Sequence, residues 1–501
     1  MPFLRRYGWL CAIAAAYLYL FPYYPRLQSA NELPRVYLVR AMVDDHTFAI
    51  DHGIREWGGT SDLSRHGEHY YQNKAPGASF VVVPVYALVE AIAGTPSLAA
   101  TMWLCRFVTG IVPTLLLLWL LWGYLARFAP EPATRRLVLV AYALGSMAFT
   151  YSVQFYAHQL SAVCIAAAWI LGDEVAIRAR GLRTMILVGF LAGLAPAVDY
   201  QTAFAGLPLL AYLGVRMRAW QRAELVRAFA YAALAAAVPI ALLLYYHQAC
   251  FGSPFKTGYN FAVTYAADHT HGLLGMTYPK LDAIIGTTIA PGNGLLVLCP
   301  WLLLALPGGV YLWRRGERAL VITVAVLALV FLYFVTSLTA WHAGWEVGPR
   351  YIVALLPFLL PLVAATFAAW RDRPLWLGAA AGLVLISLVV YVVSTATLPT
   401  WPDTFHDPLY EVAFRLLGDN AVAPNVLSTI GIHGVASVLP LFAGIAALAT
   451  YVVVRAGAGM RGLVLAAVLA IAGIAAFSLA LRHDPGTDAA YARTIYPAVA
   501  Q

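Results

Sequence analysis

Charged side chains are scarce in this sequence. Only 11% of its 501 residues are Asp, Glu, Lys or Arg, whereas 61% are hydrophobic. Soluble domains have about 25% charged and about 45–50% apolar residues. The composition therefore excludes an ordinary soluble fold.

The sequence also has no cysteine motif and no nucleotide-binding motif. The five cysteines fall inside or at the edge of apolar segments and show no CxxC spacing: Cys11, Cys105, Cys164, Cys250 and Cys299. This placement argues against a disulfide framework or a cysteine-based zinc site. There is no Walker motif, dinucleotide fingerprint or internal repeat, and the net charge of +8 comes from short basic clusters rather than one basic face. We therefore expect no nucleotide cofactor and no nucleic-acid partner.

Long apolar runs are what the sequence does contain. Runs of about 17 to 25 residues match the length of helix that crosses a bilayer. They predict an all-α polytopic membrane protein with about 13 crossings. The predicted crossings are 7–24, 100–126, 137–151, 157–172, 184–198, 201–215, 228–250, 293–312, 319–338, 350–370, 374–395, 433–454 and 460–481.

Arginine clusters between these runs give the predicted orientation. With this threading, the pairs Arg5/Arg6, Arg135/Arg136 and Arg314/Arg315 and the other arginine clusters all fall on one face, which the positive-inside rule assigns to the cytoplasm. The pattern holds only if the apolar stretch 78–94 does not cross, so we expect an interfacial or re-entrant helix there. The N-terminus is then cytoplasmic, and the composition suits a bacterial plasma (inner) membrane.

The opposite, outer face carries the long polar loops. They comprise 25–99, 251–292, 339–349 and 396–432, and they contain all three lysines of the chain. In 396–432, Asp407-Pro408 followed by apolar residues up to Gly418 predicts an amphipathic surface helix. No separate soluble domain is predicted, and we expect the functional site on this periplasmic or extracellular side.

Glu32 directly follows the first predicted crossing, at the start of a helix-compatible run. A carboxylate there is suited to act as a general base that deprotonates an acceptor. The alternative is a helix-terminal acid that complements the helix dipole or pairs with Arg35.

Lys74 lies in the run Tyr71-Gln72-Asn73-Lys74-Ala75-Pro76, directly before the segment 78–94. An ammonium group at the depth of lipid headgroups is suited to bind a phosphate. The alternative is a lysine that only anchors the end of an interfacial helix.

These features resemble the GT-C glycosyltransferases, in particular the aminoarabinose transferase and protein O-mannosyltransferase group. The similarity rests on the acid after the first crossing, the aromatic-x-x-Lys element before a juxtamembrane helix, and the number of crossings. It implies a GT-C-like module over 1–250, whose catalytic loop is 25–99, followed by a variable module over 251–501. The chain departs from that group in having Asn31-Glu32 and Lys74-Ala75-Pro76 where relatives often have Asp-Glu and Lys-Pro-Pro.

The resemblance also implies roles for residues. Glu32 would be the catalytic base, Lys74 with arginines would hold the donor phosphate, and the donor would be a polyprenyl-phosphate sugar taken from the membrane lipid. No cofactor is certain, and a divalent metal stays open. Asp44 and Asp45 could supply metal ligands or a second carboxylate, or could simply solvate the loop.

Three short outer turns supply the remaining candidates. His158 lies near the outer end of a predicted crossing, where pocket lining competes with an ordinary interfacial role, and Asp199 lies at another outer turn. The turn 339–349 joins two crossings and combines aromatic faces suited to a sugar with an arginine suited to a phosphate. Its candidates are Trp341, His342, Trp345 and Arg350.

Together these patterns predict an inverting glycosyltransferase that passes a sugar to a lipid, glycan or protein acceptor. A transporter or flippase of lipid-linked sugars would share the apolar bundle and the basic headgroup contacts, although it predicts repeats that the sequence lacks. A polysaccharide polymerase or ligase of the outer face is a further alternative.

Overall fold

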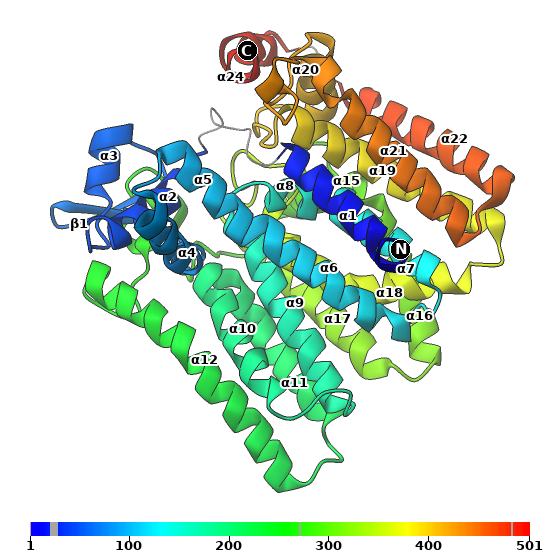
Figure 1. Ribbon diagram of the computed structural model, residues 1–501, viewed down its shortest axis with the longest axis horizontal. Helices are drawn as coiled ribbons and strands as arrows, with labels where there is room; N and C mark the ends of the chain where they lie inside the picture. The colour runs from blue at the N-terminus through cyan, green and yellow to red at the C-terminus, as the bar shows by residue number, and fades with distance from the viewer. Residues whose placement is uncertain (1, 21–28, 270–271, 482–483, 501) are drawn as a thin grey trace.

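The computed structural model describes residues 2–20, 29–269, 272–481 and 484–500, most of which are helical (Figure 1). The helices of the first half are α1 (Pro2–Leu20), α2 (Leu33–Val43), α3 (Asp51–Trp57), α4 (Gly77–Ala93), α5 (Leu98–Arg106), η2 (Phe107–Ile111), α6 (Val112–Tyr124), η3 (Leu125–Arg127), α7 (Pro132–Leu144), α8 (Met147–Ser152), α9 (Ala157–Ala176), α10 (Thr184–Val198), η4 (Tyr200–Ala205), α11 (Gly206–Arg216) and α12 (Arg222–Phe251).

The second half continues in the same way. Its helices are η5 (Gly258–Phe261), α13 (Ala266–His269), α14 (Leu281–Thr288), α15 (Leu295–Leu298), η6 (Pro300–Leu304), α16 (Ala305–Arg314), α17 (Arg318–Ser337), η7 (Arg350–Leu355), α18 (Leu356–Ala369), α19 (Pro374–Thr397), η8 (Leu409–Phe414), α20 (Arg415–Gly418), η9 (Ser428–Ile430), α21 (Val435–Ala456), α22 (Gly459–Phe477), η10 (Ser478–Ala480), α23 (Pro485–Ala490), η11 (Tyr491–Ile495) and α24 (Tyr496–Val499).

Several of these helices can cross a membrane, as the apolar runs predict. Among the described residues, eight are long and apolar enough: Leu98–Arg127, Ala157–Ala176, Arg222–Phe251, Arg318–Ser337, Arg350–Ala369, Pro374–Thr397, Val435–Ala456 and Gly459–Ala480. The chain is therefore an integral membrane protein, but the count of about 13 crossings is not confirmed. The first predicted crossing, 7–24, is helical up to Leu20, and its last residues lie outside the described part.

Several predicted crossings are interrupted or change helix type. The run 137–151 divides into α7 and α8, because Ser146 accepts a hydrogen bond from the Ala148 N–H and thereby caps a new helix. The run 293–312 is split into α15, η6 and α16, with Pro300 at the start of η6. The run 201–215 begins as the 3-10 helix η4 before α11. Hydropathy alone did not reveal these local breaks.

Helix α9 forms the centre of the bundle. Nearly all of its residues are buried, and it packs against α6, α10, α11 and η7. At the edges of the bundle, α12 and α22 leave much of their apolar surface exposed (Figure 1), as expected for helices that face lipid. Gly189 and Gly193 of α10 lie directly against the α12 backbone at Ala232 and Ala236, the small-residue packing typical of membrane helices.

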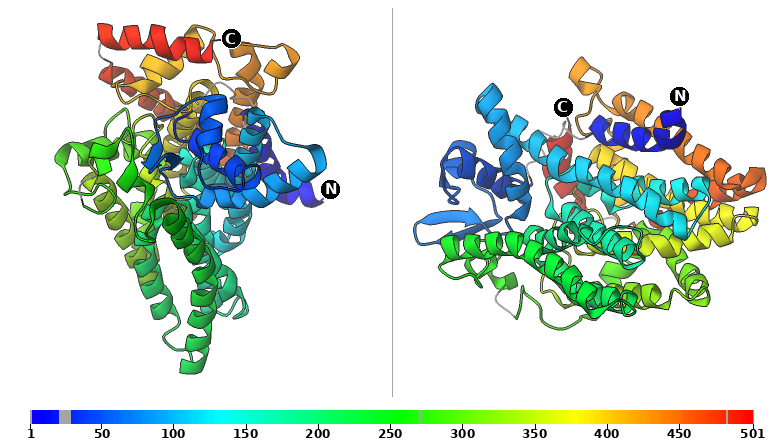
Figure 2. Two further views of the ribbon diagram at one scale, coloured as in Figure 1. Left: turned by 90° about the vertical axis from the view of Figure 1, so that its left-hand side faces the viewer. Right: turned by 60° about the horizontal axis from the view of Figure 1, so that its bottom comes forward.

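The segment after α1 gathers at one end of the bundle (Figures 1 and 2). It contains α2, α3, α4 and an antiparallel hairpin of β1 (Leu63–His66) and β2 (His69–Gln72). The hairpin corrects the all-α prediction. It is tied to the 251–292 segment, because the Ser64 hydroxyl donates to the Gly258 carbonyl at 2.6 Å. This contact brings two of the predicted outer loops together beside Lys74.

Helix α4 covers the predicted interfacial stretch 78–94 and packs against α2 and α10. It begins at Gly77, where any Cβ would overlap the Ala197 and Val198 backbone. Glycine therefore lets the chain after Lys74 approach the end of α10, next to Asp199. The predicted helix after Asp407-Pro408 is also present, as η8 and α20, and its buried Leu409 and Leu416 belong to the main core.

Candidate active site

Glu32 lies immediately before α2 and is almost completely buried, with 1% of its surface exposed. Both of its oxygens accept hydrogen bonds from the Arg106 guanidinium at 2.9 Å. The Phe155 backbone N–H donates to Glu32 Oε1 at 2.7 Å. The structure therefore holds Glu32 in a buried, bidentate ion pair that links three segments.

Arg106 is the partner that sequence reasoning missed. It lies inside the apolar run 100–126, whereas the sequence suggested Arg35 as the ion partner of Glu32. A charged residue in a membrane-spanning run is costly unless it is paired. That cost was the available signal, because an arginine in such a run demands an acid from a neighbouring segment.

Lys74 is largely buried, with 14% of its side chain exposed, at the junction of three outer segments. Its Nζ lies 3.4 Å from Asp62 Oδ1 and 5.3 Å from the centre of the Tyr259 ring. Burial lowers the pKa of Lys74, Asp62 opposes this shift, and the positive charges of Arg350 and Arg35 add to it. The predicted phosphate ligands Lys74 and Arg350 therefore share one electrostatic neighbourhood, together with Arg35.

Arg350 begins η7 and is held by the loop before it. Its guanidinium donates to the Ala343 carbonyl at 2.6 Å, and its Nε lies 3.6 Å from Glu346 Oε2. Glu346 also accepts a hydrogen bond from Asn293 at 2.7 Å. Burial raises the pKa of Glu346 to about 8 in spite of the Arg350 charge. Much of this carboxyl group is therefore protonated near neutral pH, and Glu346 leaves part of the Arg350 charge uncompensated.

Arg35 is the third buried cation. Its guanidinium donates to the backbone and side-chain oxygens of Asn31. The Nε atoms of Arg35 and Arg350 are both buried, and neither has a hydrogen-bond partner in the described protein. Buried donors without partners are rare in native proteins, so the arrangement is suited to bind an anion.

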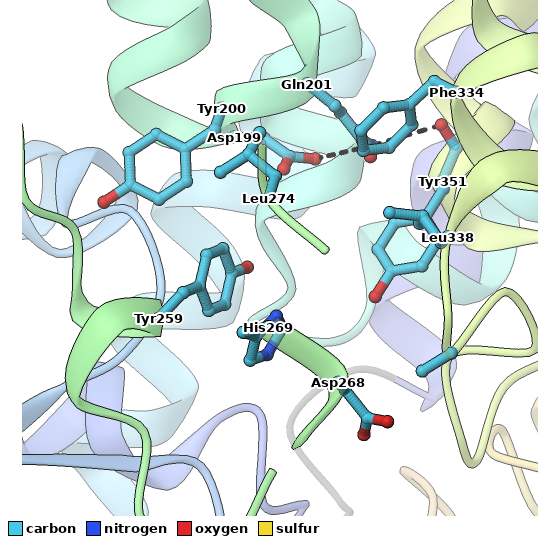
Figure 3. Close-up of a pocket in the computed structure, with 11 residues that line it drawn as sticks. Asp199, Tyr200, Gln201, Tyr259, Asp268, His269, Leu274, Phe334, Leu338 and Tyr351 are labelled. Atoms are coloured by element: carbon cyan, nitrogen blue, oxygen red, sulfur yellow. Dashed lines mark hydrogen bonds between the residues drawn. The ribbon is translucent and has the colours of Figure 1, made fainter. Parts of the chain in front are cut away.

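A pocket opens beside these cations (Figure 3). Its wall includes Asp199, Tyr200, Tyr259, His269 and Tyr351. The His269 ring stacks on Tyr259 with 4.1 Å between ring centres. Burial, with the nearby charge of Lys74, lowers the pKa of His269 to about 4, so this imidazole is neutral. Flat aromatic faces with carboxylate acceptors are suited to contact a sugar.

His158 and Asp199 meet at this pocket. His158 Nδ1 lies 2.7 Å from Asp199 Oδ2. The Gln201 amide donates to Asp199 at 3.0 Å and to the Tyr351 carbonyl at 3.1 Å (Figure 3). The structure thus brings His158 to the predicted site and adds Asp199 as its direct partner.

Asp44, Asp45 and Tyr71, like Lys74, Arg350 and His158, are not among the residues of the pocket wall. Asp44 pairs with Arg40 at 3.2 Å and accepts a hydrogen bond from Tyr86, and Asp45 pairs with His52 at 2.9 Å. Tyr71 packs edge-on against Phe251. Among the described residues, no group of three or more His, Cys, Asp or Glu side chains is arranged to hold a metal ion.

The aromatic residues of the turn 339–349 have separate contacts. The Trp341 ring covers Gly286, where a Cβ would overlap it. His342 Nδ1 lies 3.2 Å from Asp403, which raises the His342 pKa. Trp345 is 43% exposed. Of the four candidates in 339–350, Arg350 is the one whose charge lowers the pKa of Lys74.

Comparison with solved structures places the fold. The crystal structure of ArnT from Cupriavidus metallidurans bound to undecaprenyl phosphate matches with a TM-score of 0.51 and 16% identity, over 95% of this chain and 78% of that one. The apo crystal structure of ArnT from Cupriavidus metallidurans matches with a TM-score of 0.47 and 16% identity, over 92% of this chain and 75% of that one. No family model and no curated protein matches the sequence. The predicted resemblance to the aminoarabinose transferase group is confirmed at the level of the fold.

Proposed function

Because this chain has the fold of ArnT and a cluster of buried cations beside a pocket, we propose that it is a glycosyltransferase with a polyprenyl-phosphate sugar as donor. The observation that carries the proposal is the convergence of Arg35, Lys74 and Arg350, two of which have a buried Nε that makes no hydrogen bond to a described residue. A phosphate supplies the acceptor oxygens that these donors lack.

The chemistry of the donor explains why several cations are useful. A sugar linked to a polyprenyl phosphate carries one negative charge on its phosphodiester, and the departing phosphate gains a second charge as the C1–O bond breaks. Cations placed around this oxygen therefore bind the transition state more tightly than the ground state. In the same step, an acceptor oxygen or nitrogen attacks C1 from the opposite face, which inverts the configuration.

The pocket beside the cations is suited to the sugar. Tyr259 and Tyr351 offer aromatic faces, and Asp199 and Asp268 offer acceptors for hydroxyl or amino groups. The lipid tail would remain in the bilayer alongside the exposed apolar helices. The acceptor is a lipid, a glycan or a protein. We place the reaction on the outer face of a bacterial inner membrane, because the basic clusters of the short loops mark the opposite face as cytoplasmic.

The test is the release of undecaprenyl phosphate from a panel of undecaprenyl-phosphate sugars, with purified protein and a membrane extract as the acceptor source. Lys74→Ala should reduce release strongly, whereas Lys256→Ala, at an exposed lysine of the second outer loop, should not. Absence of release from every donor, with transfer of lipid-linked sugar between the leaflets of liposomes, would instead indicate a transporter.

A further inference from the structure

Glu32, the general base expected from the sequence, is already fully engaged by protein groups. Its two oxygens accept three hydrogen bonds, two from Arg106 and one from the Phe155 N–H. It is 1% exposed. To reach an acceptor it would have to break this ion pair inside a membrane-spanning helix, which is costly.

His158 has the opposite arrangement. It lies in the first turn of α9, and its Nδ1 is fixed by Asp199 at 2.7 Å. When Nδ1 carries the proton and donates it to the carboxylate, the lone pair of Nε2 is free to accept another proton. Within the described protein no group hydrogen-bonds Nε2, and this nitrogen is not among the fully buried atoms without partners.

The pair adjoins the pocket through Asp199, which lines it. The His158 ring packs edge-on against Tyr351, a pocket residue, with 5.7 Å between ring centres. Asp199 itself lines the pocket and is fixed by the Gln201 amide at 3.0 Å (Figure 3). An imidazole with one nitrogen oriented by a carboxylate and the other not hydrogen-bonded by the protein is a common arrangement for a general base.

From this geometry we propose that His158 is the general base of the transfer and that Asp199 is its positioning residue. The inference rests on the proposed function. The acceptor heteroatom forms its bond to the sugar C1 while its proton passes to His158 Nε2. The C1–O bond to the phosphate breaks, and its electron pair leaves with the polyprenyl phosphate near Lys74 and Arg350. The proton then passes from Nε2 to water. Glu32 is a positioning residue that holds Arg106 and the turn at Phe155.

Several charged and titratable groups face His158 from neighbouring elements. Asp199 carries negative charge beside the ring, and Arg350 and Arg35 carry positive charge near it. Tyr151, Tyr156 and Tyr351 pack around the ring. The acid limb of the pH–rate profile therefore reports the balance of these charges, and it should respond to Asp199 in a way that a structural contact would not.

The first experiment measures sugar transfer from a donor that the wild type consumes, together with undecaprenyl phosphate binding. His158→Gln should reduce the transfer rate on the order of 10²–10⁴-fold with binding unchanged. His406→Gln, at an exposed histidine, is the matched control and should transfer like the wild type. Retained transfer in His158→Gln, or abolished transfer in a folded, donor-binding Glu32→Gln, would overturn the inference but leave the proposed function intact.

The second experiment stays informative if His158→Gln does not fold. In Asp199→Asn the carboxylate that stabilises the imidazolium is lost, so the acid limb of the profile should move to lower pH. Asp199→Glu should restore the limb in part. An unchanged acid limb of the pH–rate profile in Asp199→Asn would contradict the proposal that Asp199 positions His158 as the base. Failure of the wild type to release undecaprenyl phosphate from any donor would instead remove the proposed function itself.

Discussion

The two ends of helix α9 differ in how completely protein groups pair their buried charges. At the C-terminal end, Asp173 is 0% exposed and accepts hydrogen bonds from Tyr124, Tyr212, Arg127 and Arg216. At the N-terminal end, Arg35, Lys74 and Arg350 share Asp62 and a largely protonated Glu346, and two guanidinium Nε atoms make no hydrogen bond within the described part of the chain. One cluster is saturated by protein groups, whereas the other has unused binding capacity.

The difference indicates what each cluster does. A buried carboxylate with four donors has no capacity left for a ligand, so the Asp173 cluster ties α6, α9 and α11 together. The cluster at the other end has a surplus of donors, which costs stability in the empty protein and is offset when an anion binds. Stability and function are thus divided between the two ends of one helix.

The largest expected effect is at the saturated end. Asp173→Asn leaves Arg127 and Arg216 without their shared buried partner, and breaking a buried ion pair costs about 3–5 kcal/mol. The melting temperature of the detergent-purified protein should fall by many degrees. Glu174→Gln, which removes the neighbouring and more exposed partner of Arg180, should change it little, because exposed pairs contribute about 0–1 kcal/mol. Equal melting temperatures for the two variants would show that the buried Asp173 cluster stabilises the protein no more than the more exposed Glu174–Arg180 pair.

The second prediction concerns the Glu32–Arg106 pair. Glu32→Gln should lower the melting temperature, because it leaves the Arg106 guanidinium buried with a neutral partner. The double variant Glu32→Gln/Arg106→Gln should recover part of that loss, since it replaces the charged pair by two amides. Transfer activity should recover with stability if Glu32 is structural. A double variant that is stable but inactive would favour Glu32 as the base.

A third prediction separates binding from chemistry at the open end. Arg350→Gln should reduce kcat/KM for the donor by about 10²-fold, more than it reduces the affinity for the intact undecaprenyl-phosphate sugar, because the second phosphate charge is absent from the donor and develops as the C1–O bond breaks. The melting temperature should change by much less than in Asp173→Asn. Arg315→Gln, at an exposed arginine, is the control. An equal loss in kcat/KM and in affinity would assign Arg350 to ground-state binding alone.

The smallest effect is expected at Glu346, whose pKa is raised to about 8. The folded state holds this proton more tightly than the unfolded chain, so stability should fall as pH rises from about 4.5 to about 8. Glu346→Gln mimics the protonated form and should flatten this dependence. It should also preserve undecaprenyl phosphate binding above pH 8, where an ionised Glu346 competes for Arg350. Melting and binding measured between pH 5 and 9 give the check.

Local sequence patterns predicted much of the fold. Apolar run lengths predicted the membrane helices, and the motif around Lys74 pointed to the fold that the ArnT comparison confirms. The breaks at Gly145–Ser146 and Cys299–Pro300 were missed because hydropathy does not register a cap or a change of helix type. The hairpin at 63–72 was missed because its polar residues resemble those of a solvated loop.

The site was predicted less completely. Lys74, Arg350 and His158 were named, and the structure brings them together, while their roles remain predictions. Arg35, Asp62 and Tyr259 were not named as site residues, because their importance depends on which loops meet, and long-range contacts leave no spacing in a single sequence. Asp199 was noticed as a turn residue, but its pairing with His158 depends on the packing of α9 against α10.

The most direct test of the account is binding of the lipid carrier to the open end of α9. Undecaprenyl phosphate and undecaprenol would be titrated against the wild type, Lys74→Ala and Lys256→Ala, with thermal unfolding as the readout. The account predicts that only the phosphorylated lipid raises the melting temperature, and that Lys74→Ala loses this response whereas Lys256→Ala keeps it. Equal stabilisation by the two lipids, or an unchanged response in Lys74→Ala, would contradict it.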